Sequence, residues 1–484
     1  MTRSAERSDY KVTFVVLLMG VVAYALLQSM VNPVLPTIQH DLHTSQNTVT
    51  WVLTAYLLSA SIFTPILGRV GDMVGKERML VATLVALGAG SVIAGLAHSI
   101  GVLILASAIQ GIGGGVLPLA FGIIRDEFPS DKVATGVGFA AALVAVGAGA
   151  GIVLAGPIVG ALNFHWLFWI PAMLVGVAIV FTYLFVPESP VRTPGGVSWL
   201  AAVLLSGWLV ALLVAVSQGP TWGWGSARVL SLLAVAVVIG VMWVVVELRV
   251  RSPLVDMRMM RTRAVWTNNL VALLFGFGMY AVTAFLPEFL QTPKSTGFGF
   301  GATIIQSGLY ILPLTVTMFV FGMFSGKIDA AIGSRAAVIL GSIASCGSYL
   351  ILAFAHHHSW EIYAASTMLG VGLGLAFSAM STLIVQAVPA NQTGVASGMN
   401  ANIRTIGGSV GAALMASIVT SHLVHGLPLE SGYTRGFALL ALVTVVATVA
   451  AFFVPAGGAP VAAHDPLLDH AELAIVAGAT LTDG

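Results

Sequence analysis

The stretch GRVGDMVGKERML, residues 68–80, concentrates five charged side chains and three glycines in a chain that is nearly free of charge elsewhere. Of the 484 residues only 8% are charged and 58% are hydrophobic, whereas about 25% of the residues of a soluble domain are charged. So few charges cannot cover the surface of a soluble globule of this length. The composition therefore predicts a polytopic membrane protein, and the charged stretch predicts a loop between two of its spans.

Apolar runs of about 20 residues, the length that an α-helix needs to cross hydrocarbon, occur about fourteen times between residues 12 and 454. They predict an all-α fold in which nearly every helix spans the membrane. The first run, 12–34, is too long for the core of a signal peptide and has no small-residue cleavage site, so it is kept as a span. The tail, residues 455–484, is rich in alanine and glycine and is expected to be disordered.

The distribution of Lys and Arg sets the expected orientation, because short loops that carry these residues stay in the cytoplasm. If the N-terminus lies inside, sixteen of the twenty basic residues fall at the inner face, three at the outer face and one, Arg404, within a span. Both termini are therefore expected in the cytoplasm, and the chain in the plasma membrane. Cys346 is the only cysteine, which excludes an intrachain disulfide and a thiolate metal cage.

Two short motifs occur twice at nearly one spacing. GRVGDMVGKER at 68–78 resembles GKIDAAIGSR at 326–335, and PSDKVATGVG at 129–138 resembles PANQTGVASG at 389–398. The offsets of 258 and 260 residues predict a duplicated six-helix unit. The expected parts are an N-terminal bundle over 12–186, two inserted helices over 197–246 and a C-terminal bundle over 265–454. The inserted helices carry almost no polar residue, so we expect them to face lipid and to line no cavity.

The charged stretch has two interpretations. Its glycines permit a tight turn and close helix contact, and Asp72 can cap a helix or pair with an arginine. A solvated loop that fixes the topology explains these features, and so does a latch between two moving halves, which the second copy of the motif favours. The residues of the predicted latch are Gly68, Asp72, Gly75, Arg78 and Asp329.

Several stretches resemble a known family. The charged stretch resembles the loop signature of the major facilitator superfamily, with its Gly, Asp, Gly and Arg positions. Three others are similar to the fourteen-helix drug:proton antiporter branch of that superfamily. They are VLPTIQHDL at 34–42 with TWVLTAYLLSASIFTPILGRVGD at 50–72, GAGAGIVLAGPIVGAL at 147–162, and ASGMNANIRTIGGSVGAAL at 396–414. The chain therefore looks like a divergent member of the multidrug efflux type.

The resemblance implies two six-helix bundles that alternate access to a central site. It also implies that Asp72 and Arg78 are charge partners of a latch that holds the outward-facing state. Export is implied as well, because the stretch at 147–162 resembles the antiporter motif of the fifth helix. The residues of that motif are Gly147, Gly151, Gly156, Pro157 and Gly160.

Three positions depart from the branch. Leu27 stands five residues before Asn32, where the branch usually has an aspartate, and Ser107 stands three residues before Gln110, where it usually has an arginine. Leu167 stands in place of the arginine of a Trp-Arg-Trp sequence after the fifth helix. These charges would be partners in proton coupling. Their absence leaves the coupling mechanism open, while the expected fold stays the same.

Polar side chains within the spans mark the expected substrate pathway. Tyr24, Gln28 and Asn32 recur every four residues and so share one face of the first helix. A polar face in lipid either borders a cavity or bonds to neighbouring helices. Gln110 lies in a glycine-rich segment, where helix packing and a place in the pathway explain it equally well.

Arg404 belongs to the same expected pathway, together with Asn400 one turn below it on the same face. It lies roughly 13 Å from the inner end of its span, at 1.5 Å per residue. A charge at that depth costs at least about 2.5 kcal/mol unless it is compensated. Its guanidinium therefore either bonds backbone carbonyls across the bundle or binds an anionic or polarised group of the substrate.

No acidic residue lies near the middle of any span, although a buried carboxylate is the usual device for proton coupling. The candidates for proton coupling are therefore Glu288, towards the outer end of the ninth span, and Asp126 and Glu127, at the inner end of the fourth. The histidine run at 356–358 is expected in an outer loop, as an ordinary polar interface or a weak metal site. The predicted set of functional residues contains no metal ligand.

The sequence has no phosphate-binding Gly-Lys loop and no nucleophile with a placed base, so it does not predict an enzyme. It predicts a secondary transporter that exports hydrophobic or amphipathic small molecules, with proton antiport as the expected mode. We expect a monomer without a cofactor or a nucleic-acid partner. The alternatives are an uncoupled, or differently coupled, carrier of a neutral solute and a non-transporting sensor on the same fold.

Overall fold

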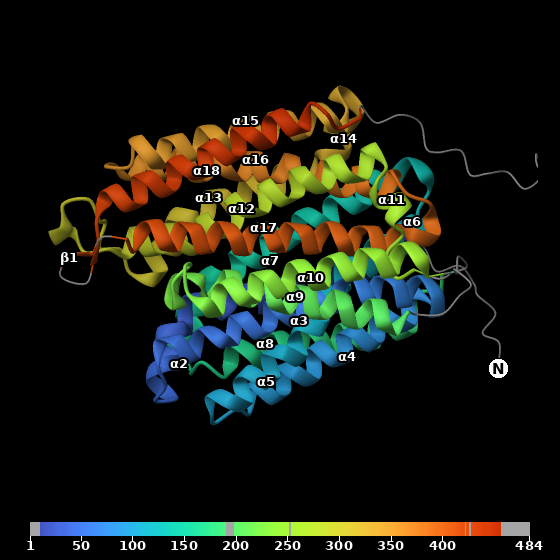
Figure 1. The fold of residues 1–484 in the computed structure, drawn as a ribbon, viewed down its shortest axis with the longest axis horizontal. Helices are drawn as coiled ribbons and strands as arrows, with labels where there is room; N and C mark the ends of the chain where they lie inside the picture. The colour runs from blue at the N-terminus through green and yellow to red at the C-terminus, as the bar shows by residue number, and fades with distance from the viewer. Residues whose placement is uncertain (1–9, 190–197, 251–252, 422, 425–426, 456–484) are drawn as a thin grey trace, which may run out of the picture.

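The computed structural model describes residues 10–189, 198–250, 253–421, 423–424 and 427–455, so the predicted disordered tail lies almost wholly outside it. The described chain is nearly all helical, and its long helices run roughly side by side along the long axis (Figure 1). Thirteen of the described helices are long and apolar enough to cross a membrane. A fourteenth, α17 (Thr393–Val419), has 27 residues but carries two asparagines and an arginine. The predicted all-α membrane fold is confirmed.

The first half of the chain contains six helical segments of membrane length. They are α1 (Tyr10–Met30), α3 (Gln46–Val74), α4 (Lys76–Gly95), α5 with α6 (Ile100–Gly111 and Val116–Glu127), α7 (Ser130–Ala161) and α8 (Trp166–Phe185). A short helix, α2 (Leu35–Asp41), follows α1. A glycine-rich 3-10 turn, Ile112–Gly115, joins α5 to α6. It lies against α3 so closely that a Cβ on Gly111 would be 2.5 Å from the Tyr56 carbonyl oxygen.

The second half again contains six long helices. They are α12 (Arg263–Gln291), α13 (Ile304–Met323), α15 (Ser334–Phe354), α16 (Ser359–Gln386), α17 and α18 (Glu430–Ala451). Two short helices, α11 (Met257–Met260) and α14 (Ser325–Ile332), precede α12 and α15. The strands β1 (Leu423–Val424) and β2 (Leu427–Pro428) form an antiparallel pair between α17 and α18.

The charged stretch that was expected to be a loop is almost entirely helical. α3 continues through Gly68 and Asp72 to Val74, and α4 begins at Lys76, so Gly75 alone separates the two helices. Gly75 has φ 131°, which a residue with a Cβ rarely adopts. The prediction of a loop is therefore wrong. One glycine makes the turn, and the charged side chains project from the ends of the two helices that it joins.

The two inserted helices, α9 (Trp199–Trp222) and α10 (Ala227–Arg249), differ in their surroundings. Figure 1 shows them between α17 and α3, and α9 contacts both of these helices. The Trp224 indole donates a hydrogen bond to the Ser417 hydroxyl at 2.8 Å. α10 is mostly exposed, as at Val237 and Val241. The expected exposure to lipid thus fits α10 and one face of α9, where Leu200 and Val203 are exposed, while Leu205 and Leu209 of α9 are buried against protein. Neither helix lines the main cavity among the described residues, as expected.

Candidate functional site

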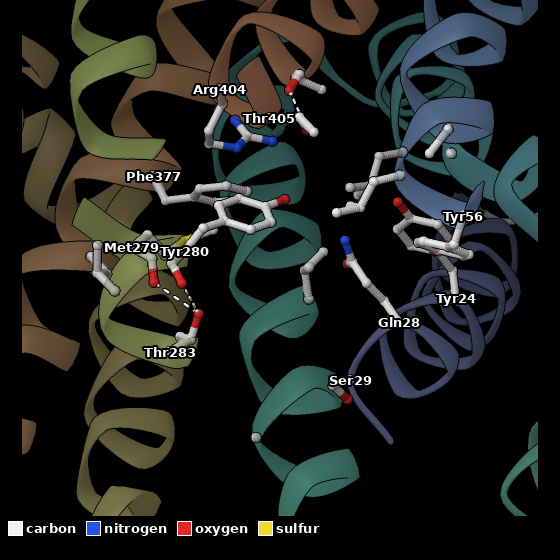
Figure 2. A pocket seen from close by; sticks show the side chains of 18 of the residues that line it. Tyr24, Gln28, Ser29, Tyr56, Met279, Tyr280, Thr283, Phe377, Arg404 and Thr405 are labelled. Carbon is white, nitrogen blue, oxygen red and sulfur yellow. Dashed lines mark hydrogen bonds between the residues drawn. The ribbon is translucent and has the colours of Figure 1, made fainter. Parts of the chain in front are cut away.

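A cavity of about 250 Å³ lies between the two halves of the molecule. Helices α1, α3 and α7 of the first half and α12, α13, α16 and α17 of the second half supply most of its wall. The wall is largely apolar, with a few polar side chains from each half (Figure 2). Such a composition suits a small molecule that has both apolar and polar parts.

The first half contributes two of the side chains predicted for the pathway. Tyr24 and Gln28 both line the cavity, and Figure 2 shows them on one side of it together with Tyr56. α1 ends at Met30, so Asn32 already lies in a 3-10 turn, and its side chain is outside the described ones. The prediction that the polar face of the first helix borders a cavity therefore fits Tyr24 and Gln28.

Arg404 approaches the cavity from the second half. Its guanidinium carbon lies 4.3 Å from the centre of the Phe377 ring, and Tyr280 lies beside it (Figure 2). Such a cation–π contact contributes about 2 kcal/mol when it is shielded from water. The guanidinium donates no hydrogen bond to any residue that the structure describes. Two roles were expected for Arg404: hydrogen bonds to backbone carbonyls, or binding of the substrate. The described residues show no such hydrogen bond, and Arg404 borders the cavity.

Several buried polar atoms of the cavity wall have no hydrogen-bond partner among the described residues. They are the Ser61 hydroxyl and both amide atoms of Asn402. A buried polar group without a partner costs about 1–3 kcal/mol, so these atoms are suited to bind a ligand.

The sequence analysis missed Tyr56, Tyr280 and Asn402. A signal existed for one of them, because Tyr280 follows Tyr24 by 256 residues, close to the offset of the repeated motifs. Asn402 lies two residues from Asn400, which places the two asparagines on nearly opposite faces of α17. The sequence does not show which of these faces borders the cavity.

Two other predicted pathway residues instead join helices. The Gln110 amide nitrogen donates to the Ser91 hydroxyl at 3.1 Å, which links α5 to α4. The Asn400 amide nitrogen donates to the Asn269 amide oxygen at 2.9 Å, which links α17 to α12. Neither lines the main cavity in the described structure. Packing, one of the two explanations offered for Gln110, is the one that the structure shows.

A buried charge cluster lies at the basic end of the bundle, defined here as the end with Gly75, Arg125 and Gly333. Lys76 Nζ lies 3.7 Å from Asp72 Oδ1 and 2.5 Å from Asp126 Oδ2. The three side chains are at most 1% exposed. One ammonium group therefore serves two carboxylates.

This cluster also joins the two halves. The backbone N–H of Val395, in α17, donates to Asp72 Oδ2 at 3.3 Å. The Arg125 guanidinium, in α6, donates to the Thr393 hydroxyl at 2.7 Å. Gly68 and Gly394 bring the backbones of α3 and α17 together, since a Cβ on Gly68 would lie 2.5 Å from the Gly394 carbonyl oxygen. The halves are thus in direct contact at the basic end.

The charge partners of the predicted latch differ from those that the resemblance implied. Arg78 Nε lies 3.2 Å from Glu188 Oε2, and the Arg78 side chain is 64% exposed. Lys76, four residues after Asp72, is the charge partner of Asp72 that Arg78 was expected to be. The implied pairing of Asp72 with Arg78 is not present in this structure. The reason is that Lys76 points into the bundle, whereas Arg78, two residues further along α4, projects from another face.

The sequence matches the family described as the Major Facilitator Superfamily over residues 17–412 and, in a second match, over 270–472. The chain belongs to this superfamily. It is therefore a membrane transporter of small molecules, and the resemblance inferred from its motifs is confirmed.

Its relatives include several bacterial export and resistance proteins. The chain is 26% identical to the multidrug transporter protein MdtP of Bacillus subtilis, over 87% of this chain and 77% of that protein. It is 27% identical to the tetracenomycin C resistance and export protein of Streptomyces glaucescens, over 86% and 77%. It is 28% identical to the methylenomycin A resistance protein of Streptomyces coelicolor, over 84% and 86%.

A solved structure has the same fold. The crystal structure of the human organic anion transporter MFSD10 superposes with a TM-score of 0.68, covers 92% of this chain and 100% of that one, and is 14% identical in sequence. The likeness concerns the fold.

The glycines of the fifth-helix motif have different environments in this superfamily member. A Cβ on Gly147 would lie 2.6 Å from the Ala25 Cβ of α1, and Gly151 packs against Ser29 of the same helix. These two positions let α7 lie close to α1. The other motif residues, which are half-buried or exposed, are Gly156, Pro157 and Gly160.

The candidates for proton coupling lie away from the cavity. Glu288, near the end of α12, is exposed and accepts a hydrogen bond from the Tyr433 hydroxyl at 3.2 Å. Asp126 is held by Lys76 at the basic end, and Glu127 follows it there. Arg404 is the only charged residue among the described residues of the cavity wall. A coupling role for any of these acids therefore stays a prediction.

The histidine run forms a polar contact with α18 at the end opposite to the basic end. His356 is buried, with Nδ1 2.8 Å from the Leu352 carbonyl oxygen and Nε2 3.0 Å from Glu430 Oε1. His357 Nδ1 lies 4.0 Å from the same carboxylate oxygen. His358 instead caps α16 together with Glu361. The sequence showed the histidines but not that Glu430, 74 residues after His356, meets them.

Proposed function

We propose that this transporter exports amphipathic small molecules across the plasma membrane by alternating access, with the cavity between the halves as its substrate site. The observation that carries the proposal is the position of the cavity: both halves build its wall, and the halves touch at the basic end. A relative rotation of the halves would break those contacts and expose the cavity to the other side. The distribution of basic residues supports a cytoplasmic location for the basic end and for both termini.

The relatives support export rather than uptake. Three of them are named for multidrug transport, for tetracenomycin C resistance and export, and for methylenomycin A resistance. The apolar and aromatic wall of the cavity suits hydrophobic or amphipathic molecules such as drugs, dyes or metabolites of the producing cell. We propose that the functional unit is the monomer, because one chain builds the whole cavity.

Access to the cavity gives a direct test. In a chain with Cys346→Ser, a Gln28→Cys variant should react with a polar thiol reagent, and an exported drug should slow the reaction. Val31→Cys is the control, since Val31, directly after the end of α1, is buried and does not line the cavity. Equal labelling of both cysteines would contradict the assignment of the cavity as the substrate site.

Efflux measurements separate a transporter from a sensor on the same fold. Cells that express the chain should lose a loaded drug or dye faster than cells without it. Ser61→Ala and Asn402→Ala should change the preference among substrates, because these side chains have unpaired atoms in the cavity. Ser206→Ala is the control, since Ser206 bonds only within its own helix α9. Normal expression without efflux of any substrate would favour the sensor.

Proton antiport is the mode expected from the antiporter branch, and its first candidate is Glu288. Glu288→Gln cannot release a proton, so it should abolish export driven by a pH gradient while it leaves downhill exchange intact. An equal response to the gradient in wild type and variant would move the proton site elsewhere, with Asp126 or Glu127 next. An uncoupled carrier is the second candidate, and the lack of a carboxylate in the described cavity wall favours it.

A further inference from the structure

The wall of the cavity contains one positively charged side chain, Arg404, and no negatively charged side chain among the described residues. Arg404 is ionised at every physiological pH, is 9% exposed and borders the cavity. The buried acids of the basic end are already paired with Lys76. Among the described residues, nothing in the wall therefore neutralises the guanidinium.

An anionic group on the substrate would complete this site. A guanidinium presents a planar set of N–H donors that fits a carboxylate or sulfonate, and the Asn402 amide provides a further unpaired donor. Tyr24, Tyr280 and Phe377 provide aromatic surface for an apolar ring. A cationic substrate would instead meet Arg404 with no carboxylate to compensate it.

We propose, on the basis of the export function above, that the substrate is an aromatic monoanion and that the membrane potential drives its export. The loaded cavity is then neutral, because the substrate balances Arg404, and the empty cavity returns with one positive charge. Each cycle thus moves one negative charge out of the cell. The negative interior favours that direction, by a concentration ratio of about 50-fold per 100 mV, or about 2.3 kcal/mol.

This mode requires no proton site. It accounts for the apolar Leu27 and the neutral Ser107 at positions where the antiporter branch usually carries charges. It also accounts for Glu288, which is exposed and bonded to Tyr433 rather than directed into the cavity. The charge that couples transport to the membrane is carried by the substrate itself.

The test uses the purified full chain in proteoliposomes, with the same pH on both sides and a potential set by potassium and valinomycin. Three naphthalene compounds of similar size serve as substrates: 1-naphthalenesulfonate, neutral 1-naphthalenesulfonamide and cationic 1-naphthyltrimethylammonium. The sulfonate should accumulate on the positive side, towards a ratio of about 50-fold at 100 mV. A strong buffer at the same pH on both sides prevents a pH gradient from forming, so that the potential alone can drive accumulation. Faster transport of the cation, or sulfonate transport that requires a pH gradient, would overturn the inference.

Variants of Arg404 assign the effect to the cavity. Arg404→Gln should lower sulfonate transport at least tenfold relative to transport of the neutral compound, whereas Arg404→Lys should keep the response to the potential. Arg228→Gln is the control, because Arg228 is exposed at the start of α10. If Arg404→Gln does not fold, binding to the wild type decides: the sulfonate should bind at least tenfold more tightly than the cation, and the reverse order would overturn the inference.

The outcomes also separate this inference from the export function. If the neutral compound crosses faster than through protein-free liposomes and the sulfonate shows no response to the potential, export stands and the anion inference fails. If none of the three compounds crosses faster than through protein-free liposomes, both fail.

A second and independent observation concerns the contact between His356 and Glu430. The Leu352 carbonyl can only accept a hydrogen bond, so His356 Nδ1, at 2.8 Å, must carry the proton. Nε2 of the neutral ring is then an acceptor, yet it lies 3.0 Å from Glu430 Oε1, another acceptor. Two acceptors at this distance require a cation between them, either a proton, carried by the ring or by the carboxyl group, or a metal ion.

We infer that His356, His357 and Glu430 bind a divalent transition metal such as Zn²⁺. Their three ligand atoms lie within 4.8 Å of one another, and tetrahedral zinc with bonds of about 2.0–2.2 Å needs ligand atoms roughly 3.3–3.6 Å apart. The Leu352 carbonyl orients the His356 ring in the way that outer hydrogen-bond partners orient metal ligands. A bound ion would tie the connection between α15 and α16 to the start of α18.

Zinc alone is sufficient to test this site. Addition of ZnCl₂ to the purified chain should raise the midpoint of thermal unfolding, and calorimetry should show one bound ion. His357→Ala should weaken binding at least tenfold, whereas His358→Ala should not, because His358 is 71% exposed and interacts with Glu361 instead. Absence of zinc binding to the wild type, or equal loss in both variants, would show that only a proton bridges His356 and Glu430.

Discussion

The two copies of the repeated charged motif, at 68–78 and 326–335, share a sequence pattern and differ in their contacts. In the first copy, Asp72 is buried, lies close to Lys76 and accepts a hydrogen bond from the Val395 backbone. In the second copy, both carboxylate oxygens of Asp329 are buried, and the neighbouring polar side chain is the hydroxyl of Ser334 in place of a cation. This burial raises the pKa of Asp329 from 3.8 to about 6. Only the first copy uses its aspartate to join the halves.

The difference begins with a shift of one residue. Gly326 and Gly333 follow Gly68 and Gly75 by 258 residues, whereas Asp329 follows Asp72 by only 257. One residue turns a helical side chain by about 100°, so the two aspartates do not point in equivalent directions. The second copy also has Ser334 where the first has Lys76, at the same offset of 258. It therefore lacks the ammonium group that holds two carboxylates in the first copy.

The glycines, in contrast, behave alike in both copies. Gly75 and Gly333 have φ of 131° and 83°, and each separates one helix from the next. The motif thus combines two separable features. The turn made by the last glycine is common to both halves, while the charged contact between the halves belongs to the first copy alone. Substitutions at equivalent positions of the two copies should therefore have unequal effects.

Lys76→Met should have the largest effect. It removes the ammonium group that contacts both Asp72 and Asp126 and leaves two buried carboxylates facing each other. Loss of one partner of a buried ion pair destabilises a protein by about 3–5 kcal/mol. The equivalent change Ser334→Ala should cost less than about 1 kcal/mol. Unfolding in detergent and the yield of membrane-inserted protein check both, and similar losses in the two variants would contradict the comparison.

Asp72→Asn should have the next largest effect. We expect it to impair transport more than folding. The amide keeps the size of the side chain and can still accept the Val395 hydrogen bond, but it no longer attracts Lys76. We expect efflux to fall at least tenfold, because charge-assisted contacts are about twice as strong as neutral ones, while insertion stays normal. Efflux and the amount of protein in the membrane are measured together. Transport at the wild-type rate in a normally inserted variant would remove the latch role.

Particular residues show how far the sequence alone could lead. The spans, the repeat and the cavity face of Tyr24 and Gln28 follow from composition, spacing and helix periodicity, which are local properties. The partners of Asp72 do not follow, because Val395 comes from a helix 323 residues away. The packing role of Gln110 could not be predicted either, since it depends on the position of Ser91 in a neighbouring helix. Contacts between distant helices decide these assignments.

Gly68→Ala should weaken the contact between the halves more than Gly326→Ala. A Cβ on Gly68 would meet three backbone atoms of Gly394 and Val395, the nearest at 2.5 Å, and a backbone atom cannot rotate away. A Cβ on Gly326 would first meet the Thr135 side chain, which can rotate, with the nearest backbone atom at 3.0 Å. The first variant should shift the molecule towards the state that is open at the basic end. Cysteine labelling at that end measures the shift, and equal labelling of the two variants would contradict the expectation.

Asp329→Asn should have the smallest effect and a distinct pH dependence. Because burial raises the pKa of Asp329 from 3.8 to about 6, the folded chain holds this proton more tightly than the unfolded chain does. Ionisation of Asp329 therefore lowers the free energy of unfolding. This loss is absent below pH of about 4, grows between pH of about 4 and 6, and is complete above pH of about 6. Asparagine stays neutral, so the variant should be more stable than the wild type at pH 8, by at most about 1 kcal/mol because partial exposure screens the charge. The two chains should unfold at the same temperature near pH 4. Thermal unfolding in detergent across this range measures the difference, and a constant difference at all pH values would mean that Asp329 is not the titrating group.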